Sequence, residues 1–182
     1  MSVNTLKISL FEQVESEKDL GITIDHHLNF KSHITNIISK ANRNMAIIRR
    51  SFDYLNPDIF TPIYTTMVRS HLDYGHSIWS PYQVQEIKRI ERVQRSATKK
   101  VNGFKHLAYE ERLRKLGLTT LAFRRQRGDM IETYKLLQDI YDPQVSITLH
   151  RDLGGRRGHD LKLYVPGGFA TDTRKHFFSN QK

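Results

Sequence analysis

The spacing of apolar residues predicts a mainly α-helical protein that begins with a small β-hairpin. Two segments alternate apolar with polar residues, the period typical of strands: Leu6, Ile8 and Leu10, then Leu20, Ile22 and Ile24. We expect them to pair across an acidic turn at residues 15–17 and to place a hairpin within residues 1–28. Because a lone hairpin is marginal in water, it should pack against another element.

Residues 29–143 carry apolar side chains at spacings of three and four, which predicts a helical bundle. The first helix would bury one stripe: Ile34, Ile37, Ile38, Ala41, Met45 and Ile48. The second would start at Asn56-Pro57-Asp58, a capping residue followed by proline at the first helical position. Pro62 should either kink this helix or mark a later start.

Residues 84–101 form the clearest amphipathic segment. At 100° per residue, one arc is apolar and the opposite arc holds Lys88, Arg92, Arg95 and Lys99. A short helix over residues 109–116 and a longer one over about 120–140 should follow, with Asp129 as an i,i+4 partner of Arg125. Residues 144–182 are predicted to be a loosely structured basic tail with glycines, strand-like only at 161–165 and 174–178.

Charge and composition narrow the classes of function. The 182 residues include 29 Lys and Arg against 19 Asp and Glu, which gives a net charge of +10, and no cysteine, which excludes disulfides and thiolate chemistry. No apolar run is long enough to span a bilayer, so we expect no membrane partner and an intracellular protein, cytoplasmic or nuclear. Residues 31–50 carry a net +5 and residues 84–101 a net +4, so the positive charge is concentrated as a binding surface requires.

The basic clusters predict contacts with the phosphates of RNA, DNA or an RNA–DNA hybrid. The candidate binding residues are Lys40, Arg43, Arg49, Arg50, Lys88, Arg92, Arg95, Lys99, Arg124 and Arg125. A solvated helix surface is the competing interpretation of such residues. Tyr74, Trp79 and Tyr82 could stack on bases, although a packed aromatic cluster is the more common role of such a loop.

The sequence lacks the residue patterns that are typical of catalytic and metal-binding sites. Asp19 and Asp25 flank a strand and would lie about 20 Å apart, too far to share a metal pair. The histidines lack a His-x-x-x-His spacing with a nearby glutamate, and no Gly-x-Ser-x-Gly turn occurs. We therefore expect no catalytic residue, no metal and no cofactor.

Ordered motifs run along most of the chain: EKDLGITID at 17–25, LNF at 28–30, SKANR at 39–43, VRSHLDYG at 68–75, WSPY at 79–82, ERVQRSATK at 91–99, YEERL at 109–113, RGDM at 127–130, RGH at 157–159 and FFS at 177–179. Together they resemble the segment that follows the reverse transcriptase palm in non-LTR (LINE-type, Jockey-like) retrotransposons, and the resemblance covers residues 16–179.

The resemblance implies a thumb and connection module that grips template and primer backbone beside a polymerase palm. The paired aspartates of such a palm are absent, because the sequence contains no adjacent aspartates. We therefore expect a non-catalytic fragment of an RNA-directed DNA polymerase that binds nucleic-acid backbone. The alternative is a protein-interaction module or a non-functional transposon remnant, which could associate with itself or with a palm supplied in trans.

Overall fold

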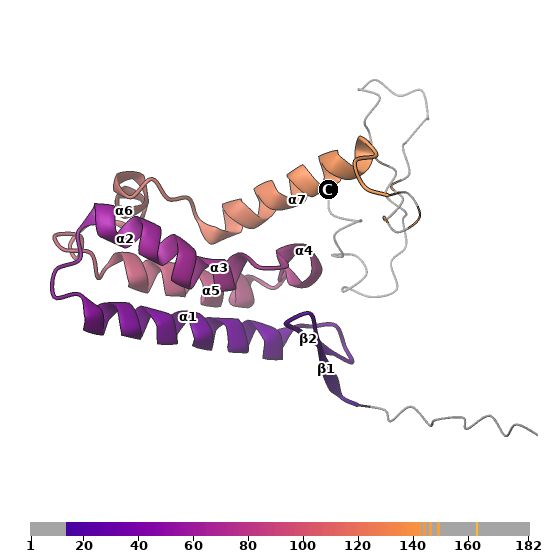
Figure 1. The fold of residues 1–182 in the computed structure, drawn as a ribbon, viewed down its shortest axis with the longest axis horizontal. Coiled ribbons are helices and arrows are strands. Elements are labelled where there is room, and N and C mark those ends of the chain that lie inside the picture. The colour runs from indigo at the N-terminus through magenta and orange to yellow at the C-terminus, as the bar shows by residue number, and fades with distance from the viewer. Residues whose placement is uncertain (1–13, 143, 145, 147–148, 150–162, 164–182) are drawn as a thin grey trace, which may run out of the picture.

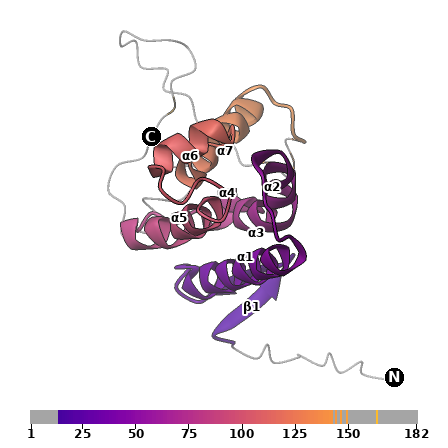
Figure 2. The same ribbon diagram turned by 90° about the vertical axis from the view of Figure 1, so that its left-hand side faces the viewer.

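The computed structural model describes residues 14–142 together with 144, 146, 149 and 163, and it confirms a mainly helical fold with an N-terminal hairpin. The helices form three layers (Figures 1 and 2). Helix α1 (Lys31–Ser51) makes the first layer, and α5 (Val84–Thr98) lies beside the segment from α2 (Pro57–Ile63) to α3 (Ser70–Asp73) in the second. Helices α6 (Tyr109–Lys115) and α7 (Leu121–Leu137) make the third. The tail strands predicted at 161–165 and 174–178 lie outside the described residues, except for Leu163.

The hairpin begins later than its apolar pattern predicts. Strand β1 (Ser16–Asp19) pairs antiparallel with β2 (Ile22–Asp25), with Lys18 opposite Thr23. The predicted turn at residues 15–17 was wrong, because residues 16 and 17 belong to β1; the predicted strand at 6–10 lies outside the described residues. The turn is Leu20-Gly21, with φ of 44° and 86°, and a two-residue turn of this kind needs positive φ at both positions.

The hairpin sits against the start of α1 and the loop after α3. Ile22 is buried, and a side chain at Gly75 would collide with its Cδ1 atom at 2.8 Å. The Tyr74 hydroxyl donates a hydrogen bond to the Leu20 carbonyl at 3.0 Å. The hairpin is therefore held against the bundle by a close backbone approach and by one hydrogen bond at its turn.

Helix α1 presents the predicted stripe to the core. Ile34, Ile37, Ala41 and Ile48 are buried, and Ile38 and Met45 pack partly buried against them. The side chain of Asp25 caps the approach to this helix, because its Oδ2 atom accepts a hydrogen bond from the Phe30 amide at 2.7 Å. The first predicted helix is confirmed in position and in its buried face.

The second predicted helix begins at Pro57 and continues through Pro62 without breaking. The Asn56 side chain accepts from the Ile59 amide at 2.8 Å, as an N-cap does. After α2 the helix widens into a π-helical segment, η1 (Tyr64–Arg69), before α3. Pro62 lacks an amide hydrogen, and the threonine hydroxyls at 65 and 66 both bond its carbonyl at 2.9 Å. The helix therefore passes Pro62 without a break, and its hydrogen-bonding pattern changes to the π type from Tyr64 onward.

The aromatic segment after α3 contributes one residue, Trp79, to the core. It folds into a short helix, α4 (His76–Trp79), and Trp79 is buried with its Nε1 donating to the Tyr74 carbonyl at 2.7 Å. Tyr74 itself is exposed on the surface over the hairpin turn. The packing role is therefore confirmed for Trp79.

A buried polar network joins α5 to the second helix, α6 and α7. The Tyr64 hydroxyl donates to Gln94, which donates in turn to the Tyr109 hydroxyl, both at 2.9 Å. The Tyr109 hydroxyl donates to Glu91, whose Oε2 atom also accepts from the amides of Leu121 and Ala122 at 3.0 and 3.3 Å. Burial raises the pKa of both tyrosines, so they remain hydroxyl donors. Glu91 thereby holds the first turn of α7 against α5.

Candidate nucleic-acid interface

The predicted basic arc of α5 forms an exposed row on the helix surface. Lys88, Arg92, Arg95 and Lys99 are all exposed, while Ile90, Val93 and Ala97 on the opposite arc are buried. We call these four residues the basic row. At 1.5 Å per residue the row is about 16 Å long, which corresponds to about five base-pair steps of a duplex.

The charges of the basic row are not neutralised within the part of the chain that the structure describes. The ion pairs formed there involve other cations, such as Arg89 with Glu86 at 2.8 Å and Arg124 with Asp73 at 2.9 Å. Arg95 stacks its guanidinium 4.1 Å above the Tyr109 ring, which fixes the side chain and leaves its charge in place. The row therefore keeps four positive charges facing solvent.

Helix α1 runs beside α5 in the same direction. Near the start of both helices the Arg89 guanidinium donates to the Thr35 hydroxyl at 3.1 Å, and beyond their ends the Asn102 amide donates to the Leu55 carbonyl at 3.0 Å. Thr35 consequently marks the side of α1 that faces α5. Asn44 marks the other side, because its amide donates to the Met67 carbonyl of η1 at 2.6 Å.

These two markers divide the basic residues that were predicted on α1. At 100° per residue, Arg49 and Arg50 lie within about 60° of Thr35, so they extend the α5 side of the surface. Lys40 lies about 40° from Asn44, and about 140° from Thr35. Lys40 therefore lies on a different flank of α1 from the basic row, so the predicted basic cluster of α1 is divided around the helix.

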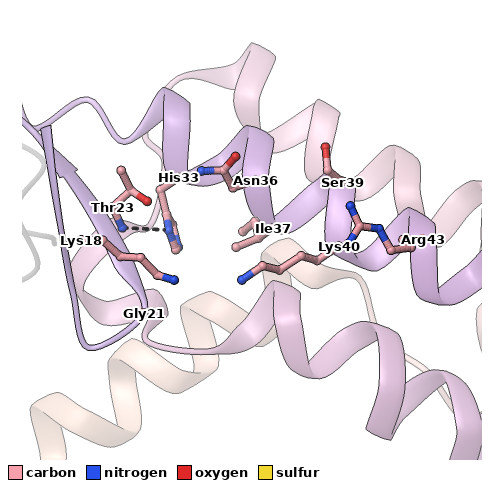
Figure 3. Close-up of a pocket in the computed structure, with 9 residues that line it drawn as sticks. All are labelled: Lys18, Gly21, Thr23, His33, Asn36, Ile37, Ser39, Lys40 and Arg43. Atoms are coloured by element: carbon pink, nitrogen blue, oxygen red, sulfur yellow. Dashed lines mark hydrogen bonds between the residues drawn. The ribbon is translucent and has the colours of Figure 1, made fainter.

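Lys40 and Arg43 line a pocket between α1 and the hairpin, shown in Figure 3. We call it the hairpin pocket; its volume is about 240 Å³, and it is lined by Lys18, Gly21, Thr23, His33, Asn36, Ile37, Ser39, Lys40 and Arg43. The ammonium groups of Lys18 and Lys40 turn toward the same space beside the His33 ring. Among the described residues no carboxylate pairs with Lys18, Lys40 or Arg43.

His33 occupies the inner wall of the hairpin pocket and is only 2% exposed. Its Nδ1 atom accepts a hydrogen bond from the Thr23 amide at 3.2 Å, so the neutral ring carries its proton on Nε2. Burial, with a smaller effect from the charge of Lys40, lowers the pKa of His33 and favours this neutral form. The Nε2 atom is buried and has no hydrogen-bond partner within residues 14–142.

Arg124 and Arg125 do not belong to the exposed surface that was predicted for them. Arg125 is 4% exposed, and this burial lowers its pKa while Glu91, Asp73 and Asp129 surround it with negative charge. Arg124 is tied to Asp73. Asp129, the expected partner of Arg125, forms no ion pair with it among the described residues, and its Oδ1 atom lies 3.4 Å from the Nε2 atom of His76. These two arginines therefore help to dock α7 on the bundle, and the prediction that they bind phosphate is wrong for Arg125.

Lys18 and His33 were not among the predicted binding residues. Lys18 lies between two acidic residues in the sequence, so the net charge of that segment is not positive and gave no sign of a basic site. His33 directly precedes the buried stripe of α1, so its position could have signalled a buried histidine, but its bond to β2 depends on tertiary structure. In the described part of the chain, no three acidic or histidine side chains gather as a metal site would require, and no helix there is long and apolar enough to cross a bilayer.

Comparison with known proteins gives one weak similarity. The chain is similar to "Uncharacterized protein B0403.1" of Caenorhabditis elegans, with 29% identity over 85 residues, which is 47% of this chain and 41% of that protein. The chain thus spans less than half the length of the relative that it matches. No family model matches, and no solved structure does.

Proposed function

We propose that this chain is a non-catalytic piece of a non-LTR retrotransposon reverse transcriptase that binds the backbone of RNA, DNA or their hybrid through the basic row. One observation carries the proposal: four exposed cations lie along one helix without a carboxylate partner among the described residues. The family in this proposal is inferred from the resemblance of the ordered motifs between residues 17 and 179. The parent activity would be RNA-directed DNA synthesis, with the catalytic palm encoded elsewhere.

Contacts made by the basic row would be to phosphates and would not read sequence. Its members are lysines and arginines on a convex helix surface, where they can neutralise a backbone but have no groove-reading geometry. Four such contacts predict a salt slope near −3.6 for a duplex, so affinity should fall by about a hundredfold between 50 and 200 mM salt. Arg49 and Arg50 would add to this slope if the strand extends past the end of α5.

The experiment is a fluorescence-anisotropy titration of labelled RNA, DNA and hybrid oligonucleotides at 50 and 200 mM salt. The variant Lys88→Glu/Arg92→Glu/Lys99→Glu should weaken binding at least tenfold at the lower salt and flatten the salt slope by about 2 to 3. The control Arg114→Glu/Lys115→Glu/Arg127→Glu makes the same change in net charge on α6 and α7. Equal losses in both variants, or a wild-type affinity insensitive to salt, would refute the proposal.

A protein-interaction role is the second candidate, because α7 exposes an apolar stripe. Phe123, Met130 and Tyr134 are exposed and fall within about 40° of one another around the helix. Such a stripe could contact a polymerase palm or a second copy of this chain. Size-exclusion chromatography with mass detection separates the cases, since assembly through this stripe should persist in high salt whereas carried-over nucleic acid should dissociate.

A further inference from the structure

We propose that the hairpin pocket is a phosphate-binding site, in which His33 Nε2–H, Lys18, Lys40 and Arg43 hold one phosphate group. This proposal adds a second binding site to the proposed function. It depends on that function only in taking the phosphate to be part of a nucleic acid. The basic row would contact backbone along an open surface, whereas this pocket would enclose a single group at the junction of β1, β2 and α1.

The charge distribution is the first argument for an anion. Lys18 and Lys40 approach the same space from opposite walls, and Arg43 adds a third positive charge one turn further along α1. Like charges that face each other repel unless an anion lies between them. No carboxylate that the structure describes lines the pocket, and that of Asp25 on β2 is engaged by the amides of His27, Asn29 and Phe30 at 2.7–3.2 Å.

The unpartnered donor of His33 is the second argument. Thr23 donates to Nδ1, so Nε2 must present its hydrogen, and a buried donor without an acceptor is costly. Nε2 has almost no accessible surface here, so a phosphate oxygen would reach it only after the adjoining side chains move aside; it would then satisfy this donor while the lysines and Arg43 neutralise its charge. Arginine and lysine are the usual phosphate ligands of proteins.

The size and the surroundings of the pocket fit this assignment. Water occupies about 30 Å³ per molecule in the liquid, so a volume of about 240 Å³ has room for a phosphate group with several waters. Asn36 and Ser39 lie on the α1 wall as further hydrogen-bonding groups. The floor is fixed, because the Thr23–His33 bond joins the free edge of β2 to α1.

The test uses inorganic phosphate and oligonucleotides as probes on the full chain. In NMR titrations, inorganic phosphate should shift the Thr23 amide and the His33 imidazole more than potassium chloride does at equal ionic strength. The variant Lys40→Ala/Arg43→Ala should weaken phosphate binding at least tenfold. The matched control Lys88→Ala/Arg92→Ala removes two exposed cations from the basic row and should leave phosphate binding unchanged.

A 5′-phosphorylated and a 5′-hydroxyl single strand identify the source of the phosphate. A preference for the phosphorylated strand that vanishes in Lys40→Ala/Arg43→Ala assigns a terminal phosphate, and equal weakening of both strands assigns an internal phosphodiester. If only the binding of inorganic phosphate is weakened, the ligand of the pocket is a free anion. The assignment is overturned if phosphate leaves Thr23 and His33 unshifted, or if the pocket variant binds all three probes as the wild type does. If the basic-row variant binds oligonucleotides as tightly as the wild type, that result counts against the proposed function but not against the assignment of this pocket.

Discussion

Replacing Glu91 with alanine should destabilise the fold more than any surface change, because this carboxylate holds three elements together. It accepts hydrogen bonds from the Tyr109 hydroxyl and from the amides of Leu121 and Ala122. Its negative charge also acts on the buried guanidinium of Arg125. Glu91→Ala therefore leaves two helix-terminal amides and one hydroxyl without this acceptor, and it removes a negative charge near the buried guanidinium of Arg125.

The expected loss is about 3–5 kcal/mol, the usual range when one partner of a buried ionic cluster is removed. This is a large fraction of the roughly 5–15 kcal/mol that stabilises a typical domain. Glu91→Gln keeps the volume but turns an amide NH₂ toward backbone donors, so it should cost about 1–3 kcal/mol. Glu110→Ala is the control, since Glu110 is exposed in the first turn of α6 and should contribute at most about 1 kcal/mol.

Urea unfolding followed by far-UV circular dichroism and by fluorescence measures these differences. Trp79 is the single tryptophan of the chain and is buried in α4, so it reports on the bundle independently of helix content. Coincident transitions would justify a two-state analysis. A loss below about 1 kcal/mol for Glu91→Ala, equal to that of Glu110→Ala, would show that α7 is not anchored by this network.

Two further predictions concern the contacts of His76 and His33. A Cβ atom at Gly128 would collide with the His76 ring, so Gly128→Ala should lose about 1 kcal/mol net despite the better helix propensity of alanine; the double variant with His76→Ala should recover it in urea unfolding, and additive losses would contradict the clash. The pKa of His33 is lowered from 6.5, so the unfolded chain binds the extra proton first and wild-type stability should fall as pH drops below about 6.5. His33→Gln should show a weaker loss between pH 7.5 and 5.5, and identical pH profiles would contradict a neutral buried ring.

Periodicity was sufficient to predict the longer helices because each buries one face against a common core, whereas the short helix α4 lies in a segment expected to be a loop. The arc of α5 is the clearest example: the residues on its apolar side are buried and Lys88, Arg92, Arg95 and Lys99 are exposed. The same periodicity could have warned of the polar network. Gln94 lies about 40° from Ile90 around the helix, inside the apolar arc, where a polar side chain must find buried partners.

Other features depend on contacts between distant segments, and local patterns do not contain them. The Leu20-Gly21 turn places leucine in the left-handed region, which carries no ordinary turn signal, so the hairpin was predicted too early in the chain. Arg125 has the charge of a surface residue and is buried only because Asp73, Glu91 and Asp129 converge on it. The division of the α1 cations depends on which neighbour flanks each side of that helix, and this is a property of the assembled bundle.

The separation of the two cationic sites constrains the ligand that could use both. The basic row lies on α5 and Arg49 lies on the side of α1 that faces it, whereas Lys40, at the hairpin pocket, lies about 140° around α1 from Thr35. A duplex has a persistence length of about 150 base pairs, so it cannot follow a turn of this size around one helix without a large bending cost. A single strand can, because its backbone is flexible. If both sites hold one ligand, the salt slope for a single strand should lose about 0.7 per contact on mutation of either site, whereas the slope for a duplex should respond to the basic row alone.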